Sequence, residues 1–214
     1  MNRAPLPVAV LVSGRGSNLQ AILDAIRAGH LNARVVLVAS DRPEAEALGR
    51  ARESGVATVA LAPADFPDRA AWNAALDEAL QRAGVELVLL AGFMRVLGPA
   101  LVARWQGRIL NIHPALLPRY RGLHTHRRVL EAGERMHGAS VHFVTDELDG
   151  GPVVLQAQVP VLPADDEASL MARVQAREHE VYARVIGWFA EGRLRWVEGG
   201  PWLDERPLDR PVIV

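Results

Sequence analysis

Residues 7–19 read PVAVLVSGRGSNL, and this stretch indicates the class of fold. The apolar run 7–12 has the length of a buried strand, and the glycine-rich turn after it leads at once into a helical run at 19–28. A strand, a tight turn and a helix in this order are typical of the first unit of an α/β protein. We therefore expect a sheet whose first strand lies near 7–12.

The remainder of the first half repeats this alternation of short apolar runs and longer amphipathic ones. Further strands are predicted near 34–39, 57–61 and 86–91. Before the last of these, apolar residues recur on one helical face, at Trp72, Leu76, Ala79, Leu80 and Ala83. The pattern predicts an α/β, Rossmann-like fold, with a mostly parallel twisted sheet and helices on both faces.

After about residue 105 the pattern changes. Strands are predicted at 108–112, 139–144 and 153–161, followed by a long helix near 166–191 that begins after the acidic residues 165–167. We predict a single domain over 1–214, since about 200 residues commonly form one α/β core. It divides into a phosphate-binding half at 1–105, a catalytic half at 106–200 and an irregular proline-rich tail at 201–214.

Composition excludes several classes of chemistry. The chain has no cysteine, and all 24 of its basic residues other than histidine are arginines, so neither a thiolate nor a lysine is available as nucleophile, Schiff base or P-loop lysine. The net charge of −1 does not favour nucleic acid as a partner. The N-terminal apolar run is too short for an export signal or a membrane span, so we expect a cytoplasmic enzyme with no membrane partner.

The turn at 13–18 is the first candidate binding site. Glycines allow backbone N–H groups to converge, and Gly16, Ser17 and Asn18 stand where a helix begins, so the turn can hold a phosphate. Ser17 and Asn18 also offer side-chain caps. A dinucleotide fingerprint is the rival interpretation, because Asp41 follows the next strand, but Leu19 replaces its third glycine. An ordinary glycine turn is the structural alternative.

The predicted strand at 108–112 carries the second candidate site. Asn111 and His113 are two residues apart and therefore face the same side of a strand. An amide that stabilises an oxyanion beside an imidazole that moves a proton suits acyl transfer to an amine, although a strand histidine can also be structural. Asp149 begins the turn DGGP and can meet His113 if the two loops lie at one edge of the sheet.

Two further groups of polar residues invite a functional interpretation. His124 and His126, together with His137 and His142, could form a metal site, but they lack a recognised ligand spacing, and we predict no metal. Glu178 lies on the apolar face of the long predicted helix, where a carboxylate needs a partner. That partner is either a hydroxyl or amino group of a ligand or an arginine.

Several motifs resemble the phosphoribosylglycinamide formyltransferase family. They are SGRGSNL at 13–19, AGFMR at 91–95, NIHP at 111–114 with LP at 117–118, GLHTH at 122–126, and VHFV at 141–144 followed by LDGGP at 148–152. The resemblance covers essentially the whole chain in order. It implies the formyltransferase fold and transfer of the formyl group of 10-formyltetrahydrofolate to the amine of glycinamide ribonucleotide in purine biosynthesis, without a metal.

The resemblance also implies roles for individual residues. The substrate phosphate would bind Gly16, Ser17 and Asn18, and the sugar hydroxyls would bind Glu178. Asn111 and His113 would polarise the formyl group, supported by Asp149, whose charge we expect to raise the pKa of His113. The folate would bind Asn111 in the catalytic half, which the resemblance makes the folate-binding half as well. It would also bind five residues of the first half: Arg69, Met94, Arg95, Val96 and Leu97.

Two positions depart from the usual pattern of the family. Ala115 stands where serine is common and Arg121 where some members have proline, which affects loop polarity rather than the chemistry. Two alternatives stay open: a related folate-dependent formyltransferase that acts on another acceptor, and a nicotinamide-dependent oxidoreductase.

Overall fold

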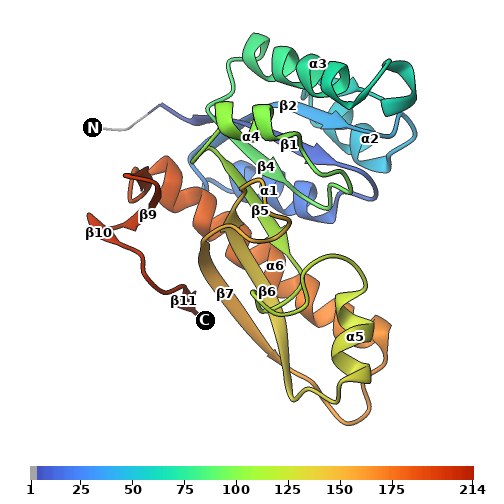
Figure 1. Cartoon of the computed structure of the whole chain (residues 1–214), viewed down its shortest axis with the longest axis vertical. Helices are drawn as coiled ribbons and strands as arrows, with labels where there is room; N and C mark the ends of the chain where they lie inside the picture. The colour runs from blue at the N-terminus through green and yellow to red at the C-terminus, as the bar shows by residue number, and fades with distance from the viewer. Residues whose placement is uncertain (1–3) are drawn as a thin grey trace.

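The computed structural model describes residues 4–214, which form one eight-stranded sheet and a separate three-stranded sheet (Figure 1). The order across the main sheet is β11-β7-β6-β5-β4-β1-β2-β3. Its strands are β1 (Leu6–Val12), β2 (Ala33–Ser40), β3 (Thr58–Ala60), β4 (Leu87–Leu90), β5 (Ile109–His113), β6 (Met136–Phe143), β7 (Val153–Pro160) and β11 (Val212–Ile213). The helices are α1 (Ser17–Arg27), α2 (Glu46–Glu53), α3 (Arg69–Arg82), α4 (Pro99–Arg104), α5 (Thr125–Glu131) and α6 (Glu167–Ala190), with a 3₁₀ turn η1 (Pro63–Asp65).

The first five strands pair in parallel, which confirms the predicted mostly parallel sheet. Side chains of β1 alternate between the two faces, so that Val8 and Val10 belong to one hydrophobic cluster and Ala9 and Leu11 to another. Helices α1, α2 and α6 cover the first face, and α3 and α4 cover the second. Burial on both faces explains why these strands read as continuous apolar runs.

Strands β5, β6 and β7 pair antiparallel and extend the sheet in the second half of the chain. β6 begins earlier than predicted, since Gly138 interrupts the apolar pattern but fits where β7 approaches so closely that a Cβ would collide with Ala157 O. Helix α6 begins where the sequence predicts, because Asp166 and Ser169 form a reciprocal capping box. Within residues 4–214, no helix combines the length and apolar character needed to cross a membrane.

The prediction of an irregular tail is wrong. Strands β8 (Leu194–Val197), β9 (Gly200–Leu203) and β10 (Arg206–Pro207) form the three-stranded antiparallel sheet, and β11 adds to the edge of β7. Gln158 N–H donates to Val214 O, and Val214 N–H donates to Gln156 O. These strands are too short to show a clear periodicity, and β9 and β10 contain proline. β8, β9 and β10 pair with their neighbours along the chain, whereas β11 depends on β7, a partner far away in the sequence.

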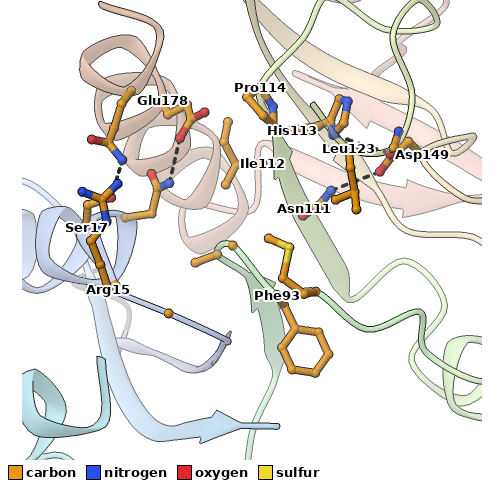
Figure 2. A pocket seen from close by; sticks show the side chains of 18 of the residues that line it. Arg15, Ser17, Phe93, Asn111, Ile112, His113, Pro114, Leu123, Asp149 and Glu178 are labelled. Carbon is orange, nitrogen blue, oxygen red and sulfur yellow. Dashed lines mark hydrogen bonds and ion pairs between the residues drawn. The ribbon is translucent and has the colours of Figure 1, made fainter. Parts of the chain in front are cut away.

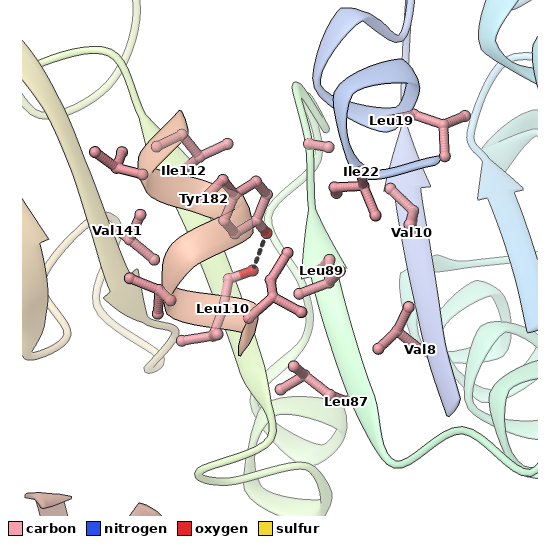
Figure 3. Close-up of a cluster of buried hydrophobic side chains, with 14 of the residues drawn as sticks. Val8, Val10, Leu19, Ile22, Leu87, Leu89, Leu110, Ile112, Val141 and Tyr182 are labelled. Carbon is pink, nitrogen blue, oxygen red and sulfur yellow. Dashed lines mark hydrogen bonds between the residues drawn. The ribbon is translucent and has the colours of Figure 1, made fainter. Parts of the chain in front are cut away.

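Tyr182 of α6 ties the long helix to the centre of the sheet (Figure 3). Its ring is fully buried, and its hydroxyl lies 3.1 Å from Leu90 O, at the end of β4, and 3.0 Å from Leu110 O, near the start of β5. The side chain therefore supports the two strands that lead into the loops bordering the candidate site.

We expect Tyr182→Phe to lower the free energy of unfolding by about 1 kcal/mol, because the variant removes the hydrogen bonds of a buried hydroxyl to two strand carbonyl groups. Equilibrium unfolding in urea measures this change. Tyr120→Phe is a matched control, since the Tyr120 hydroxyl donates to Glu134 at the surface and its loss should matter less. Equal stability of the wild type and Tyr182→Phe would contradict the prediction.

Candidate active site

A cavity of about 420 Å³ opens at the carboxyl-terminal ends of β1, β4 and β5 (Figure 2). Ligands bind at this edge in open parallel sheets. The cavity brings together ten of the residues singled out from the sequence: Gly16, Ser17, Asn18, Met94, Arg95, Val96, Asn111, His113, Asp149 and Glu178. Arg69 and Leu97 are not among the residues that line it.

The glycine turn after β1 places the amino end of α1 at the cavity. Gly16 has a φ angle of 77°, and a Cβ at this position would lie 2.6 Å from the Cβ of Ala47, so glycine is required. Among the described residues, no side chain caps this end of the helix. The first-turn N–H groups and the positive end of the helix dipole are therefore available to an anion.

Ser17 and Asn18 pair with α6 instead of capping α1, contrary to the sequence-based expectation. Gln175 Nε2 donates to Ser17 Oγ over 2.8 Å, and Asn18 Nδ2 donates to Glu178 Oε2 over 2.8 Å. Gln175 also lines the cavity and is not among the predicted residues. Its position three residues before Glu178, on the same helical face, is the signal that could have found it.

Glu178 has an amide partner rather than the arginine that the sequence left open. The carboxyl is buried, and burial raises its pKa, while the hydrogen bond from Asn18 acts in the opposite direction. Asn18 Oδ1 is buried and has no hydrogen-bond partner among residues 4–214. An unpaired buried acceptor in the wall of a cavity indicates a ligand that brings a hydroxyl or amino group.

Asn111, His113 and Asp149 converge on the opposite wall of the cavity. The shared face of Asn111 and His113 is the one that the alternation along β5 predicts. His113 Nδ1 lies 3.5 Å from Asp149 Oδ2, and Asn111 Nδ2 lies 3.5 Å from Asp149 Oδ1. Asp149 has a positive φ of 47°, and Gly122 N–H donates to its Oδ2 over 2.8 Å. The carboxylate is therefore more than a turn residue, because its two oxygens face the two candidate catalytic side chains.

Hydrogen-bond partners decide which imidazole nitrogens carry protons. Tyr120 O lies 2.9 Å from His113 Nε2 and can only accept, so Nε2 carries a hydrogen and Nδ1, beside Asp149, is the nitrogen that gains or loses a proton. Likewise, His142 Nδ1 donates to Phe143 O over 2.8 Å, which leaves His142 Nε2 to accept from Asn111 Nδ2 over 3.0 Å.

His142 thus orients the amide of Asn111, a role that the sequence analysis missed. The two residues lie opposite each other in the antiparallel pairing of β5 with β6. This register is the only signal that could have indicated the contact, and it depends on tertiary structure.

The expectation that Asp149 raises the pKa of His113 is wrong in its net result. Burial of the imidazole lowers its pKa and outweighs the charge of Asp149 and the hydrogen bond to Tyr120 O, both of which raise it. Burial alone would raise the pKa of the Asp149 carboxyl, but the neighbouring His142 ring and the Gly122 N–H lower it below its ordinary value. At neutral pH the structure therefore favours a neutral His113 beside an ionised Asp149.

The 92–97 loop forms the third wall, and its residues differ in their position. Met94 and Val96 are about half exposed beside the cavity, whereas Leu97 is 5% exposed and packs in the core. Arg69 donates to Val96 O over 2.8 Å and to Leu97 O over 2.9 Å. Arg69 therefore holds the backbone of this loop and does not line the cavity of the candidate site. Together with Arg95 it lines a neighbouring cavity.

Two of the four histidines considered as metal ligands pair with each other. His137 Nε2 lies 3.0 Å from His126 Nδ1, and burial, aided by the nearby His126 and His113, lowers the pKa of His137 to about 4. Within the described part of the chain, no group of three or more His, Cys, Asp or Glu side chains is arranged to hold a metal ion.

The fold and the cavity define a class of protein. A model of the formyl transferase family matches residues 6–186. The chain therefore belongs to the formyl transferase family.

Within that family, the chain is similar to phosphoribosylglycinamide formyltransferases. It is 52% identical to that of Escherichia coli (strain K12) over 94% of this chain and 95% of the relative, and 42% identical to that of Haemophilus influenzae over 95% and 96%. The solved structure of the enzyme from Coxiella burnetii matches with a TM-score of 0.93 at 44% identity, over 97% of this chain and 99% of the other.

Proposed function

We propose that this chain transfers the formyl group of 10-formyltetrahydrofolate to the amine of glycinamide ribonucleotide, giving formylglycinamide ribonucleotide and tetrahydrofolate in purine biosynthesis. The observation that carries the proposal is the convergence of Asn111, His113 and Asp149 on a cavity bordered by an uncapped helix end and by an apolar loop. The names of the relatives agree with it.

The two substrates fit opposite ends of the cavity. Gly16, Ser17 and Asn18 would hold the substrate phosphate at the positive end of α1. Glu178 and the unpaired Asn18 Oδ1 would accept hydrogen bonds from the sugar hydroxyls. This arrangement accounts for a buried acceptor, Asn18 Oδ1, that has no partner among residues 4–214, and for a buried carboxyl, that of Glu178, that accepts from Asn18.

The apolar rim suits the folate. Exposed apolar side chains around the cavity would cover its rings, namely Met94, Val96, Leu123 and Leu148. Arg95 lines this cavity and the neighbouring one and would attract the carboxylate tail, and Arg69 lines the neighbouring one. The folate supplies the formyl group as co-substrate, and the proposal involves no metal.

His113 and Asn111 would perform the transfer. Asn111 Nδ2 would donate to the formyl oxygen as negative charge develops there, replacing its long 3.5 Å contact to Asp149. His113 Nδ1, neutral at the start, would accept the proton that the amine loses as it bonds to the formyl carbon. Asp149 would stabilise the imidazolium, and His113 would return the proton to the folate nitrogen as its bond to that carbon breaks.

A nicotinamide-dependent function lacks its expected ribose ligand. Asp41 is 3% exposed, and its two carboxylate oxygens accept from Ser13 and Arg95, so it is not available to a ribose hydroxyl. The cytoplasmic location and the expectation that neither nucleic acid nor membrane is a partner stay predictions from the composition.

An absorbance assay for tetrahydrofolate release tests the proposal. We expect turnover that requires both 10-formyltetrahydrofolate and glycinamide ribonucleotide. Release with another amine acceptor in place of the ribonucleotide would support a related formyltransferase. Protection from thermal unfolding by NAD, without protection by folate, would contradict folate-dependent transfer altogether.

We expect Gly16→Ala to raise KM for glycinamide ribonucleotide by about tenfold or more, because relieving the collision with Ala47 displaces the N–H groups at the start of α1 and weakens a charge-assisted interaction. Steady-state kinetics with each substrate varied in turn measure this change. KM for the folate should stay within about twofold, a negligible difference in binding energy, because the folate is proposed to bind at the apolar rim and not at this turn.

Gly29→Ala is the matched control for the phosphate turn. Gly29 has a similar φ of 74°, but nothing lies within 4 Å of the added Cβ, and it is at the other end of α1. Both variants therefore place an alanine at a positive φ angle and carry the same backbone strain, but only Gly16→Ala should displace the phosphate turn. Equal increases of KM for both substrates in Gly16→Ala would indicate general distortion and not loss of a phosphate site.

A further inference from the structure

Asp41 is a buried carboxylate that the proposed reaction does not use. It follows β2 directly, beside the ends of β1 and β4, and its side chain is 1% exposed. Ser13 Oγ donates to Asp41 Oδ1 over 2.5 Å, and Arg95 Nε donates to Asp41 Oδ2 over 3.0 Å. Each oxygen of the carboxylate thus accepts from a residue that follows a different strand of the sheet.

Ser13 transmits the constraint to the backbone of the 92–97 loop. A hydroxyl has one hydrogen, and because Asp41 accepts that hydrogen, the Ser13 oxygen presents its lone pairs to the Met94 N–H, which donates over 2.9 Å. Ser13 N–H also donates to Gly92 O over 3.2 Å. Asp41 therefore controls both the direction of the hydroxyl that holds Met94 and the position of the Arg95 side chain.

The phosphate turn is held by different contacts. Ala47 N–H at the start of α2 donates to Gly14 O over 3.1 Å, and Arg50 Nε donates to Arg15 O over 2.8 Å. Neither contact involves Asp41. Loss of the Asp41 carboxylate should consequently loosen the loop at Met94 and Arg95 while the turn at 14–16 keeps its support from α2.

We infer that Asp41 is a positioning residue for the folate side of the cavity. It sets the affinity for 10-formyltetrahydrofolate by holding Met94 and Arg95 in place, and it touches neither substrate. The inference rests on the proposed function, since the loop it holds is the proposed folate wall. It also gives a role to an acidic residue that the sequence pattern alone associates with a dinucleotide ribose.

Asp41→Asn is the informative substitution. An amide has one accepting oxygen in place of two, so either Ser13 or Arg95 loses its acceptor whichever way the side chain turns. We expect KM for the folate to rise by about tenfold or more, the usual consequence of losing a hydrogen bond to a charged group, whereas kcat and KM for the ribonucleotide should each stay within about twofold. Calorimetric titration with tetrahydrofolate should show the same loss of affinity.

Asp77→Asn is the matched control. Asp77, like Asp41, has partners on both oxygens: Oδ1 accepts from Trp105 Nε1 over 2.8 Å, and Oδ2 accepts from Gln81 Nε2 over 2.8 Å and lies 2.9 Å from Arg104 Nε in an ion pair. It joins α3 to the end of α4 and does not line the cavity. The control should lose stability without a change in KM for the folate. A split between the two KM values that occurs only in Asp41→Asn distinguishes positioning of the loop from general destabilisation.

Ser13→Ala gives a second, independent test. It removes the hydroxyl that links Asp41 to Met94 N–H, so KM for the folate should rise, and the double variant with Asp41→Asn should show less than the product of the two single effects. Unchanged folate KM in both single variants, or equal increases of both KM values, would overturn the inference. Absence of tetrahydrofolate release by the wild type in the same assay would instead refute the proposed function.

Discussion

Asp149→Asn is expected to lower kcat by about 100- to 10,000-fold, the range usual for loss of positioned acid–base catalysis. The substitution keeps the shape of the side chain but removes the negative charge 3.5 Å from His113 Nδ1. His113 is buried, so an imidazolium formed during the reaction would lose the charge that compensates its desolvation. Stopped-flow or steady-state assays of tetrahydrofolate release measure the change in kcat.

The same variant has a defined effect on pH dependence. Burial already places the pKa of His113 below its ordinary value of 6.5, and Asp149 acts to raise it, so removing Asp149 should lower that pKa further. Because the neutral form accepts the proton, the acidic limb of the pH profile of kcat/KM should move to lower pH. NMR of labelled histidine should show the same direction.

The pKa shifts also predict the sign of the pH dependence of stability. Since the folded-state pKa of His113 is depressed, the unfolded chain binds a proton first as pH falls below about 6.5, and stability decreases from there toward the folded-state pKa. The depressed pKa of Asp149 contributes stability that is lost at still lower pH. Asp149→Asn should remove this second contribution.

Asp146→Asn serves as the control for Asp149, because Asp146 is an exposed aspartate three residues earlier in the same loop. Its kcat and its His113 titration should match those of the wild type. If Asp149→Asn also left both quantities unchanged, Asp149 would be a turn residue and His113 would act without it.

Asn111→Asp is expected to reduce kcat by about 100- to 1,000-fold, the typical cost of losing one oxyanion donor. The new carboxylate cannot donate to the formyl oxygen, and it would stand beside Asp149 Oδ1, where Asn111 Nδ2 now lies 3.5 Å away. It would also lose the donor that faces His142 Nε2. The rate should therefore fall more than the affinity for either substrate, which steady-state kinetics can separate.

Asn73→Asp is the matched control for a new charge at a buried amide. Asn73 is 8% exposed, donates to Arg69 O and accepts from Gly98 N–H, so its replacement should destabilise the fold but leave kcat close to that of the wild type. Nearly full kcat in Asn111→Asp would mean that the developing charge is stabilised by another group.

Much of the site could be predicted because its residues follow strands whose positions and parallel direction can be predicted from the sequence. Gly16, Asn111 and His113 stand at the carboxyl ends of two parallel strands, and such ends lie at one edge of a sheet. The capping residue Asp166 and the apolar stripe that includes Glu178 are likewise local features, because helix periodicity spans only a few turns.

The contact between His113 and Asp149 is less local. Asp149 reaches the cavity only because β6 turns back antiparallel to β5 and the loop before β7 lies over the end of the sheet. The same register places His142 against Asn111. A turn signal such as DGGP predicts a reversal of the chain, but it does not indicate which residues the side chains of the turn will contact.

Sequence by itself determined the α/β fold, the glycine turn that begins α1 and the shared face of Asn111 and His113, since each depends on short-range periodicity and on the geometry of neighbouring residues. Tertiary structure alone decided that burial outweighs Asp149 in the pKa of His113 and that Arg69 braces a loop. It also decided that the tail supplies β11, the last strand of the sheet. The desolvation of His113 and the pairing of β11 with β7 both depend on groups from distant parts of the chain, so no local sequence pattern predicts them.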